Sequence, residues 1–266
     1  FSLAGEELLV LSGHEALVSL IDLGDAGQPI ATASYDGTLR LWDPHDGSCR
    51  AVLHGNAGEI RGLTRSSTGI LMTGHDDGTA RLWPDTNVAS AIVLAGHNRP
   101  VWSVAFDSTG ARAVTGSLDG SARVWDTRDG SVLAVLTGHA EGVWNAQFID
   151  ADRVLTVSND RTVRVWSLTG GDPPLVLTGH SDPITDVAVS STGRFFVTAS
   201  ADRSAKIWRL DRLTSDSDRL AAALDRATIH CLDVEQRVRE LGEAPNEAAA
   251  AFSECEHHHG RMPAGK

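Results

Sequence analysis

Residues 133–166 have the sequence LAVLTGHAEGVWNAQFIDADRVLTVSNDRTVRVW, which is one copy of a unit that recurs along the chain. A Gly-His pair opens the unit at Gly138 and His139, an aspartate stands in a turn at Asp160, and Trp166 closes it. Between these marks lie three apolar runs, VWNAQF, RVLTV and TVRVW. Short strand-like runs at even spacing, separated by turn residues, are typical of all-β architectures.

The unit occurs five times with a fixed internal spacing. The closing tryptophans are 41 or 42 residues apart, an aspartate stands six positions before each one, and a threonine stands four positions before each aspartate. The four complete sets are His14, Thr32, Asp36 and Trp42; His97, Thr115, Asp119 and Trp125; His139, Thr156, Asp160 and Trp166; and His180, Thr198, Asp202 and Trp208. The second unit keeps Thr73, Asp77 and Trp83 but has Asn56 in place of the histidine.

This pattern resembles the WD40 repeat family through its Gly-His openings and its closing pairs Trp42-Asp43 and Trp125-Asp126. The resemblance covers roughly residues 5–210 and implies a β-propeller of four-stranded blades around a central channel. In WD40 proteins the matching aspartate orients the histidine, which bonds the threonine, whose hydroxyl bonds the tryptophan. The four complete sets are therefore expected to form a structural network, while Asn56 leaves the second unit open.

A catalytic interpretation of the same threonine, histidine and aspartate would make them a nucleophile, a base and an orienting acid. Their presence in every unit argues against it, because an enzyme normally has one active site. The chain also lacks the common nucleophile-elbow, zinc-protease, phosphate-loop and dinucleotide-binding motifs. We therefore predict no catalytic residues, with a propeller enzyme carrying a channel-mouth active site as the alternative.

The number of blades stays open at this point. Residues 1–13 align without a gap with residues 126–138, so the chain is expected to begin with the outer strand of a blade. In one arrangement this strand, at residues 6–12, completes the blade begun by residues 180–208 and closes a five-bladed ring. In the other, which we favour, the chain is part of a larger propeller in a longer parent protein with upstream domains.

Residues 211–266 differ from the propeller domain at residues 1–210. They are rich in Ala, Leu, Glu and Arg with helical periodicity, which predicts a short C-terminal extension of three α-helices. The tail resembles that of large bacterial WD40 signalling proteins linked to a Ser/Thr kinase or a nucleotide-switch ATPase, for example at Leu241-Gly242-Glu243 and His259-Gly260-Arg261. Its His and Cys residues include no Cys-x-x-Cys pair, so no metal site is predicted.

Composition narrows the functional classes further. The 266 residues carry a formal net charge of −12, which disfavours binding to a nucleic-acid phosphate backbone. No apolar run is long enough to span a membrane, and no signal peptide is recognisable. The three cysteines have no regular spacing, so no disulfide framework is expected. We predict a cytoplasmic protein without a cofactor.

The candidate binding residues lie where each inner strand begins and just before each turn aspartate. WD40 proteins commonly bind peptides on this top face. The partner-binding candidates are Trp102, Trp144, Arg61, Tyr35, Leu118 and Asn159, because aromatic and arginine side chains dominate protein interfaces. Alternatively, both tryptophans simply pack between blades. The predicted function is a non-catalytic interaction scaffold or sensor module of a bacterial multidomain signalling protein, with a purely structural spacer as a further alternative.

Overall fold

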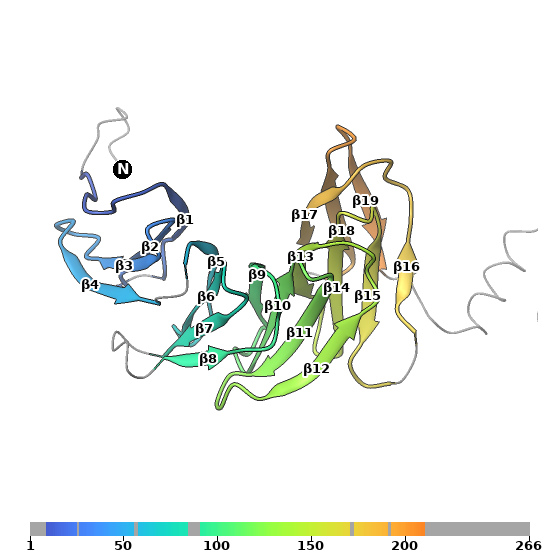
Figure 1. The fold of residues 1–266 in the computed structure, drawn as a ribbon, viewed down its shortest axis with the longest axis horizontal. Coiled ribbons are helices and arrows are strands. Elements are labelled where there is room, and N and C mark those ends of the chain that lie inside the picture. The colour runs from blue at the N-terminus through green and yellow to red at the C-terminus, as the bar shows by residue number, and fades with distance from the viewer. Residues whose placement is uncertain are drawn as a thin grey trace, which may run out of the picture. The chain divides into compact units, whose positions relative to one another are not determined.

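The computed structural model of the protein describes residues 9–25, 27–55, 58–84, 91–170, 173–190 and 193–210. The chain divides into two units, Phe1–Arg209 and Leu210–Lys266, and nearly all described residues belong to the first. These residues form nineteen β-strands and no α-helix (Figure 1). None of the described segments is therefore a helix that could cross a membrane. The helices predicted for residues 211–266, with their His and Cys residues, lie outside the described residues.

The strands are grouped into five antiparallel sheets (Figure 1). Within each sheet, every strand pairs with the next one along the chain. The first sheet contains β1 (Val18–Asp22), β2 (Ile30–Ser34), β3 (Thr38–Trp42) and β4 (Cys49–His54). The second contains β5 (Ile60–Arg65), β6 (Leu71–His75), β7 (Ala80–Trp83) and β8 (Ile92–Leu94). The third contains β9 (Val101–Phe106), β10 (Arg112–Ser117), β11 (Ser121–Asp126) and β12 (Val132–Thr137). The fourth contains β13 (Val143–Phe148), β14 (Arg153–Ser158), β15 (Val163–Ser167) and β16 (Leu175–Leu177), and the fifth contains β17 (Ile184–Val189), β18 (Phe195–Ser200) and β19 (Ala205–Arg209). The predicted all-β class with five repeated units is confirmed.

Every sheet makes the same tight turn between its second and third strands. In the first three sheets Gly37, Gly78 and Gly120 hold the turn with φ values of 77°, 84° and 82°. Arg161 and Arg203 take this place in the last two sheets, both with φ of 68°, a left-handed conformation that costs a non-glycine residue about 1 kcal/mol. In all five sheets the N–H at this position donates to the carbonyl three residues earlier. The hydrogen bond thus preserves the turn where glycine is missing.

Neighbouring sheets stack through their first strands, so the apolar core lies between sheets. Small residues let these strands approach: a Cβ atom on Gly62 of β5 would lie only 3.0 Å from Cγ2 of Val104 on β9 in the next sheet. At the following boundary, buried Val114 and Ala122 belong to one cluster with Val143 of β13. Because each sheet covers the next in this way, alternate residues on both faces of the middle sheets are apolar and buried.

The outer faces of the first and last sheets are exposed. Ile207 on β19 is 74% exposed, whereas Val124, at the equivalent place in the third sheet, is 1% exposed. Val18 on β1 is 41% exposed, whereas its equivalent Val101 is fully buried. Both faces carry the apolar residues that pack against a neighbouring sheet elsewhere in the protein.

Closure of a five-bladed ring by residues 6–12, one of the two arrangements that the sequence left open, is not formed in the described part of this segment. The fifth sheet has three strands there, and residues 9–12 are not in a strand. Leu9 and Leu11 instead lie beside Gly47 of the first sheet, as Ile92 and Leu94 of β8 lie beside Gly130. This N-terminal segment therefore occupies, against the first sheet, the place that an outer strand of a preceding sheet takes elsewhere.

Candidate functional site

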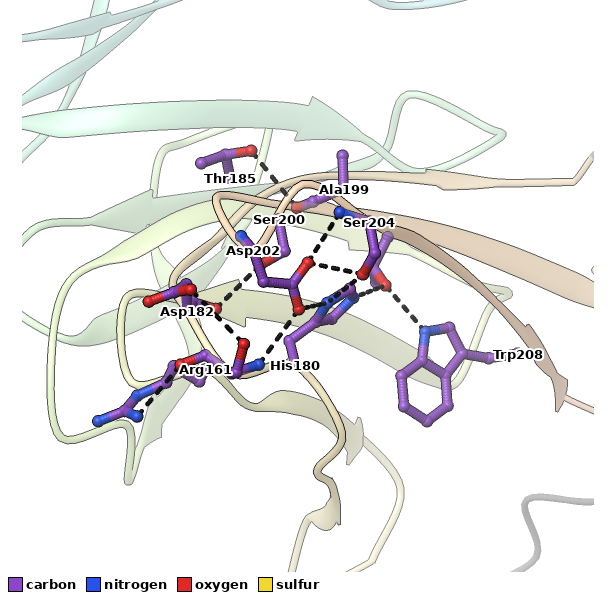
Figure 2. Close-up of polar contacts among 11 residues, drawn as sticks. Arg161, His180, Asp182, Thr185, Ala199, Ser200, Asp202, Ser204 and Trp208 are labelled. Carbon is purple, nitrogen blue, oxygen red and sulfur yellow. Dashed lines mark hydrogen bonds and ion pairs between the residues drawn. The ribbon is translucent and has the colours of Figure 1, made fainter.

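A hydrogen-bonded relay connects four residues within the first, third, fourth and fifth sheets. In the fourth sheet Trp166 Nε1 donates to Thr156 Oγ1 at 2.8 Å, Thr156 Oγ1 lies 2.7 Å from His139 Nε2, and His139 Nδ1 lies 2.8 Å from Asp160 Oδ2. Figure 2 shows the equivalent arrangement around His180, Asp202 and Trp208. The sets at His14 and His97 have the same contacts, with distances of 2.8–3.0 Å.

The direction of the relay follows from its donor at the tryptophan. An indole N–H can only donate, so the threonine oxygen accepts from it and donates its own proton to the histidine Nε2. The histidine is then a neutral imidazole with its proton on Nδ1, which donates to the aspartate. The aspartate also accepts from a backbone N–H and from the Ser or Thr two residues later, such as Thr162 after Asp160. Every polar atom of this buried set has a partner.

The protonation states in the relay are fixed by burial and hydrogen bonding. Burial lowers the pKa of His97 and His139, despite the opposing effect of Asp119 and Asp160. Burial alone would raise the pKa of Asp160, but hydrogen bonds from Thr162 and His139 lower it to about 2. Similar bonds hold the pKa of Asp36, Asp119 and Asp202 below the usual value. The relays at His97 and His139 thus each carry one negative charge at neutral pH.

In the second sheet a histidine from a different position contacts the threonine. Trp83 Nε1 donates to Thr73 Oγ1 at 2.9 Å, and this oxygen lies 2.8 Å from Nε2 of His75 on the same strand. A Cβ on Gly55 would lie 2.7 Å from Cε1 of His75, so the imidazole fills the space beside the opening glycine. His75 stands where the other sheets have serine: Ser34, Ser117, Ser158 and Ser200.

This substitution leaves the second relay incomplete at its acidic end. His75 Nδ1 is buried and has no hydrogen-bond partner among the described residues. In the part of the chain that the structure describes, Asp77 accepts hydrogen bonds from the backbone N–H and the hydroxyl of Thr79 alone. Burial and the positive charge of Arg81 lower the pKa of His75 to about 4. Asn56, which the sequence places at the usual histidine position, lies outside the described residues.

A row of aromatic and arginine side chains crosses four sheets on the face formed by the loops before the first strands and the turns after the second strands. We refer to this face as the top face. Arg61 Cζ lies 4.4 Å from the ring centroid of Tyr35 and 5.0 Å from that of Trp102. The Trp102 and Trp144 rings meet edge to face, with centroids 4.5 Å apart and planes at 84°. Trp144 Nε1 in turn donates to Asn159 Oδ1. We call Tyr35, Arg61, Trp102 and Trp144 the aromatic row.

Two carboxylates hold the arginine of the aromatic row in place. The Arg61 guanidinium forms ion pairs with Glu59 at 2.5 Å and with Asp76 at 3.0 Å. The hydrogen bond that Arg61 donates to Asp76 is the main reason that the pKa of Arg61 is raised. The two ion pairs thereby hold the Arg61 guanidinium between the Tyr35 and Trp102 rings. An arginine stacks favourably on aromatic rings in such a position. The Arg61 side chain is therefore held in one orientation by its own neighbours.

A cavity of about 460 Å³ opens beside the aromatic row at the boundary between the third and fourth sheets. Its lining includes the apolar residues Leu118 and Trp144, the polar residue Asn159 and the charged residues Arg99, Asp119 and Glu141. Trp144 also borders a second cavity of about 190 Å³, together with Arg61 and Trp102. Trp144 is therefore the side chain that connects the aromatic row to both cavities.

A family model described as "WD domain, G-beta repeat" matches residues 5–43, 47–84, 89–126, 130–167 and 171–209. This chain belongs to that family. Each match contains one of the five relay tryptophans and ends one residue after it. The family assignment and the repeated hydrogen-bonded relay thus describe the same five units.

Several curated proteins contain similar WD repeats. The chain is 32% identical over 108 residues to Autophagy-related protein 16 of Arabidopsis thaliana, which covers 40% of this chain and 21% of the relative. It is 35% identical over 105 residues to Nuclear distribution protein PAC1 of Arthroderma benhamiae, covering 35% and 23%. It is 36% identical over 74 residues to Ribosome biogenesis protein YTM1 of Saccharomyces cerevisiae, covering 28% and 16%. The matched segments span less than a quarter of each of these relatives.

The structure brings all six residues predicted to bind a partner into one region of the WD-repeat unit. Tyr35, Arg61, Trp102, Trp144 and Asn159 are connected by the contacts described above, and Leu118 lines the cavity with Trp144 and Asn159. The two tryptophans do pack against each other across a sheet boundary, as the alternative prediction held, but both remain only half-buried. Packing and exposure to a cavity are thus combined in these side chains.

Sequence reasoning missed two features of this WD-repeat face. The acidic residues Asp119 and Glu141 line the same cavity, which the repeat pattern did not indicate because Glu141 lies in a loop without a fixed motif. His75 was also missed, although the sequence carried a signal for it. A histidine replaces a recurring serine in the one unit that lacks the Gly-His pair, and these two departures from the repeat compensate each other.

Proposed function

We propose that this WD-repeat chain is a non-catalytic interaction module that binds a peptide segment of a partner protein on its top face. WD40 domains bind protein partners. The observation that carries the proposal for this face is the aromatic row, held rigid by Glu59 and Asp76 and adjoining a cavity of about 460 Å³. Tryptophan, tyrosine and arginine supply most of the binding free energy in protein interfaces.

The geometry of the relay supports binding instead of catalysis. The threonine hydroxyl of each complete relay accepts from an indole and donates to an imidazole, so it has no proton left to transfer. Thr115, Thr156 and Thr198 are also fully buried, where no substrate reaches them. Their role in the proposed module is to hold the turns and loops of the top face in fixed positions.

The cellular setting of the module is a further part of the proposal. The resemblance of the tail to bacterial WD40 signalling proteins favours a cytoplasmic scaffold or sensor within a larger regulator. The acidic composition favours protein partners over nucleic acid. These points depend on the sequence of the tail and on composition, and the peptide site itself does not require them.

The test is selection of peptides from a displayed random library on the full chain, followed by affinity measurements with substituted proteins. The double variant Trp102→Ala/Trp144→Ala should lose more than about tenfold in affinity, since truncating central aromatic anchors costs about 2 kcal/mol or more. Leu133→Ala is the matched control, because Leu133 is an exposed apolar residue on the outer strand β12. Circular dichroism must show that each variant keeps its β-structure.

The Trp102→Phe variant adds a second control. Trp102 Nε1 is buried without a partner among the described residues, so phenylalanine removes an unsatisfied donor while keeping an aromatic ring. This variant should remain as stable as the wild type. Unchanged peptide affinity in the folded double alanine variant would refute binding at the aromatic row.

A further inference from the structure

The cavity beside Trp144 combines apolar walls with negative charge. Leu118 and Trp144 are the large apolar residues of its lining, and the acidic residues Glu141 and Asp119 belong to the same lining. Asp119 stays ionised because hydrogen bonds from Ser121 and His97 outweigh its burial and lower its pKa. Arg99 supplies the single positive charge of the cavity, so the two carboxylates leave the lining negative overall.

The relays extend this negative charge across the whole top face. Each complete relay joins an ionised aspartate to a histidine through Nδ1, and burial lowers the pKa of His97 and His139, which therefore stay neutral at physiological pH. Within the described residues, Asp119 and Asp160 thus form no ion pair with a charged side chain, although Arg123 and Arg164 lie near enough to act on His97 and His139. Both aspartates lie at the edge of the top face with side chains about one-tenth exposed. The network that stabilises the fold is also a row of fixed anions.

The loops and turns of the top face carry far more acidic than basic residues. The ten acidic residues are Glu15, Asp36, Glu59, Asp76, Asp77, Asp119, Glu141, Asp160, Asp182 and Asp202, and the four basic residues, including the first residues of the inner strands, are Arg61, Arg99, Arg161 and Arg203. Among these four, only Arg61 forms an ion pair within the described residues. These loops and turns therefore carry a formal excess of negative charge, which the arginines beside the opening glycines, such as Arg123 beside Gly96, offset only in part.

The opposite ends of the strands are organised differently. There, five aspartates each pair with an arginine: Asp22 with Arg65, Asp43 with Arg50, Asp107 with Arg112, Asp126 with Arg128, and Asp150 with Arg153. Local pairing cancels most of the charge at these ends. Among the described residues, unpaired negative charge is therefore more frequent on the face that also holds the aromatic row.

This inference rests on the proposed function and specifies the chemistry of the partner. We propose that the top face binds a cationic peptide segment, and that one lysine or arginine side chain enters the cavity between Leu118 and Trp144 toward Glu141 and Asp119. Such a side chain has an apolar stem and a charged head, which matches the two parts of the lining. Its charged head can also lie against the Trp144 ring, a favourable contact for a cation.

The experiment measures binding of three fluorescein-labelled peptides of equal length to the full chain by fluorescence anisotropy. Alanine alternates with arginine in the first peptide, with glutamine in the second and with glutamate in the third. The arginine peptide should bind most tightly, and its affinity should fall as salt rises, because screening shortens the reach of charges from about 30 Å at 0.01 M to about 8 Å at 0.15 M. Equal affinities for the arginine and glutamine peptides would overturn the proposal.

Two substitutions that each remove one negative charge test where the peptide binds. Glu141→Gln, at an exposed residue lining the cavity, should weaken the arginine peptide about threefold, as expected for one charge pair near the surface. Asp152→Asn removes the same charge at the opposite ends of the strands and should leave the affinity unchanged. Trp144→Ala should weaken binding more than either one. An equal effect of Glu141→Gln and Asp152→Asn would show diffuse attraction and refute the cavity as the site.

The charge inference and the proposed function fail in different ways. If library selection yields neutral or acidic peptides that still depend on Trp144, the interaction module stands and the cationic partner is refuted. If the arginine peptide binds but ignores both Trp144→Ala and Glu141→Gln, both the cavity and the aromatic row are refuted as its site.

Discussion

His75 takes the place of a histidine that its own repeat lacks, with its Nε2 2.8 Å from Oγ1 of Thr73, two residues earlier on the same strand. In the other four sheets the partner histidine comes from the loop before the first strand. The threonine hydroxyl must donate to something, because it already accepts from a buried indole. That requirement is met here from a different position in the sequence.

Moving the histidine back should restore the standard relay. His75→Ser should lower the free energy of unfolding by about 1–3 kcal/mol, because the Thr73 hydroxyl loses its buried acceptor. Adding Asn56→His to this variant should recover most of the loss, since the second sheet then has the Gly-His pair and serine of the other sheets. Urea denaturation measures both changes. A double variant no more stable than His75→Ser alone would contradict the exchange.

Stability should decrease as the pH falls from about 6.5 toward 4. The pKa of His75 is about 4 in the folded protein and 6.5 ordinarily, so the unfolded chain binds a proton first and is favoured as the pH drops. This difference corresponds to about 3 kcal/mol. Burial of His97 and His139 acts in the same direction. Urea midpoints across this range measure the effect.

The His75→Gln variant isolates this contribution. It should flatten the decrease between pH 6.5 and 4, because glutamine has no proton to take up in this range. His54→Gln is the matched control at an exposed histidine on β4. A wild-type slope retained in His75→Gln would show that another group causes the pH dependence.

The complete relay should be more sensitive to loss of its aspartate than the incomplete one. Asp160 accepts from His139, from the Ala140 N–H and twice from Thr162, whereas within the described residues Asp77 accepts from Thr79 alone. Asp160→Asn should therefore cost about 2–3 kcal/mol, as charged hydrogen bonds at a partly buried site do, and Asp77→Asn less than about 1 kcal/mol. Similar losses in the two variants, measured by chemical denaturation, would argue against this difference between sheets.

The exposed face of the fifth sheet gives a fourth prediction. Val124→Ala should cost about 2 kcal/mol because this side chain is buried between two sheets. Ile207→Ala, at the equivalent but exposed position, should change stability by less than about 0.5 kcal/mol. A loss as large as that of Val124→Ala would mean that another sheet covers this face in solution, which is the outcome required by a closed ring.

The fold class and the members of four relays could be predicted from the sequence, since their spacing is local. The histidine, threonine, aspartate and tryptophan of one set all lie within one repeat unit. A tight turn and two paired strands then bring them together regardless of what neighbouring repeats do. For the same reason, the positions of Trp102 and Trp144 at the starts of inner strands followed directly from the repeat.

Only the tertiary structure decided the features that depend on contacts between repeats or on unique substitutions. The stacking of Arg61 between Tyr35 and Trp102 requires three sheets at a particular spacing, which no single repeat encodes. The use of His75 depended on the free space beside Gly55, where a side chain other than glycine would collide with the imidazole. Repetition therefore determined the hydrogen bonds within each sheet, whereas packing between sheets decided which side chains meet to form a surface.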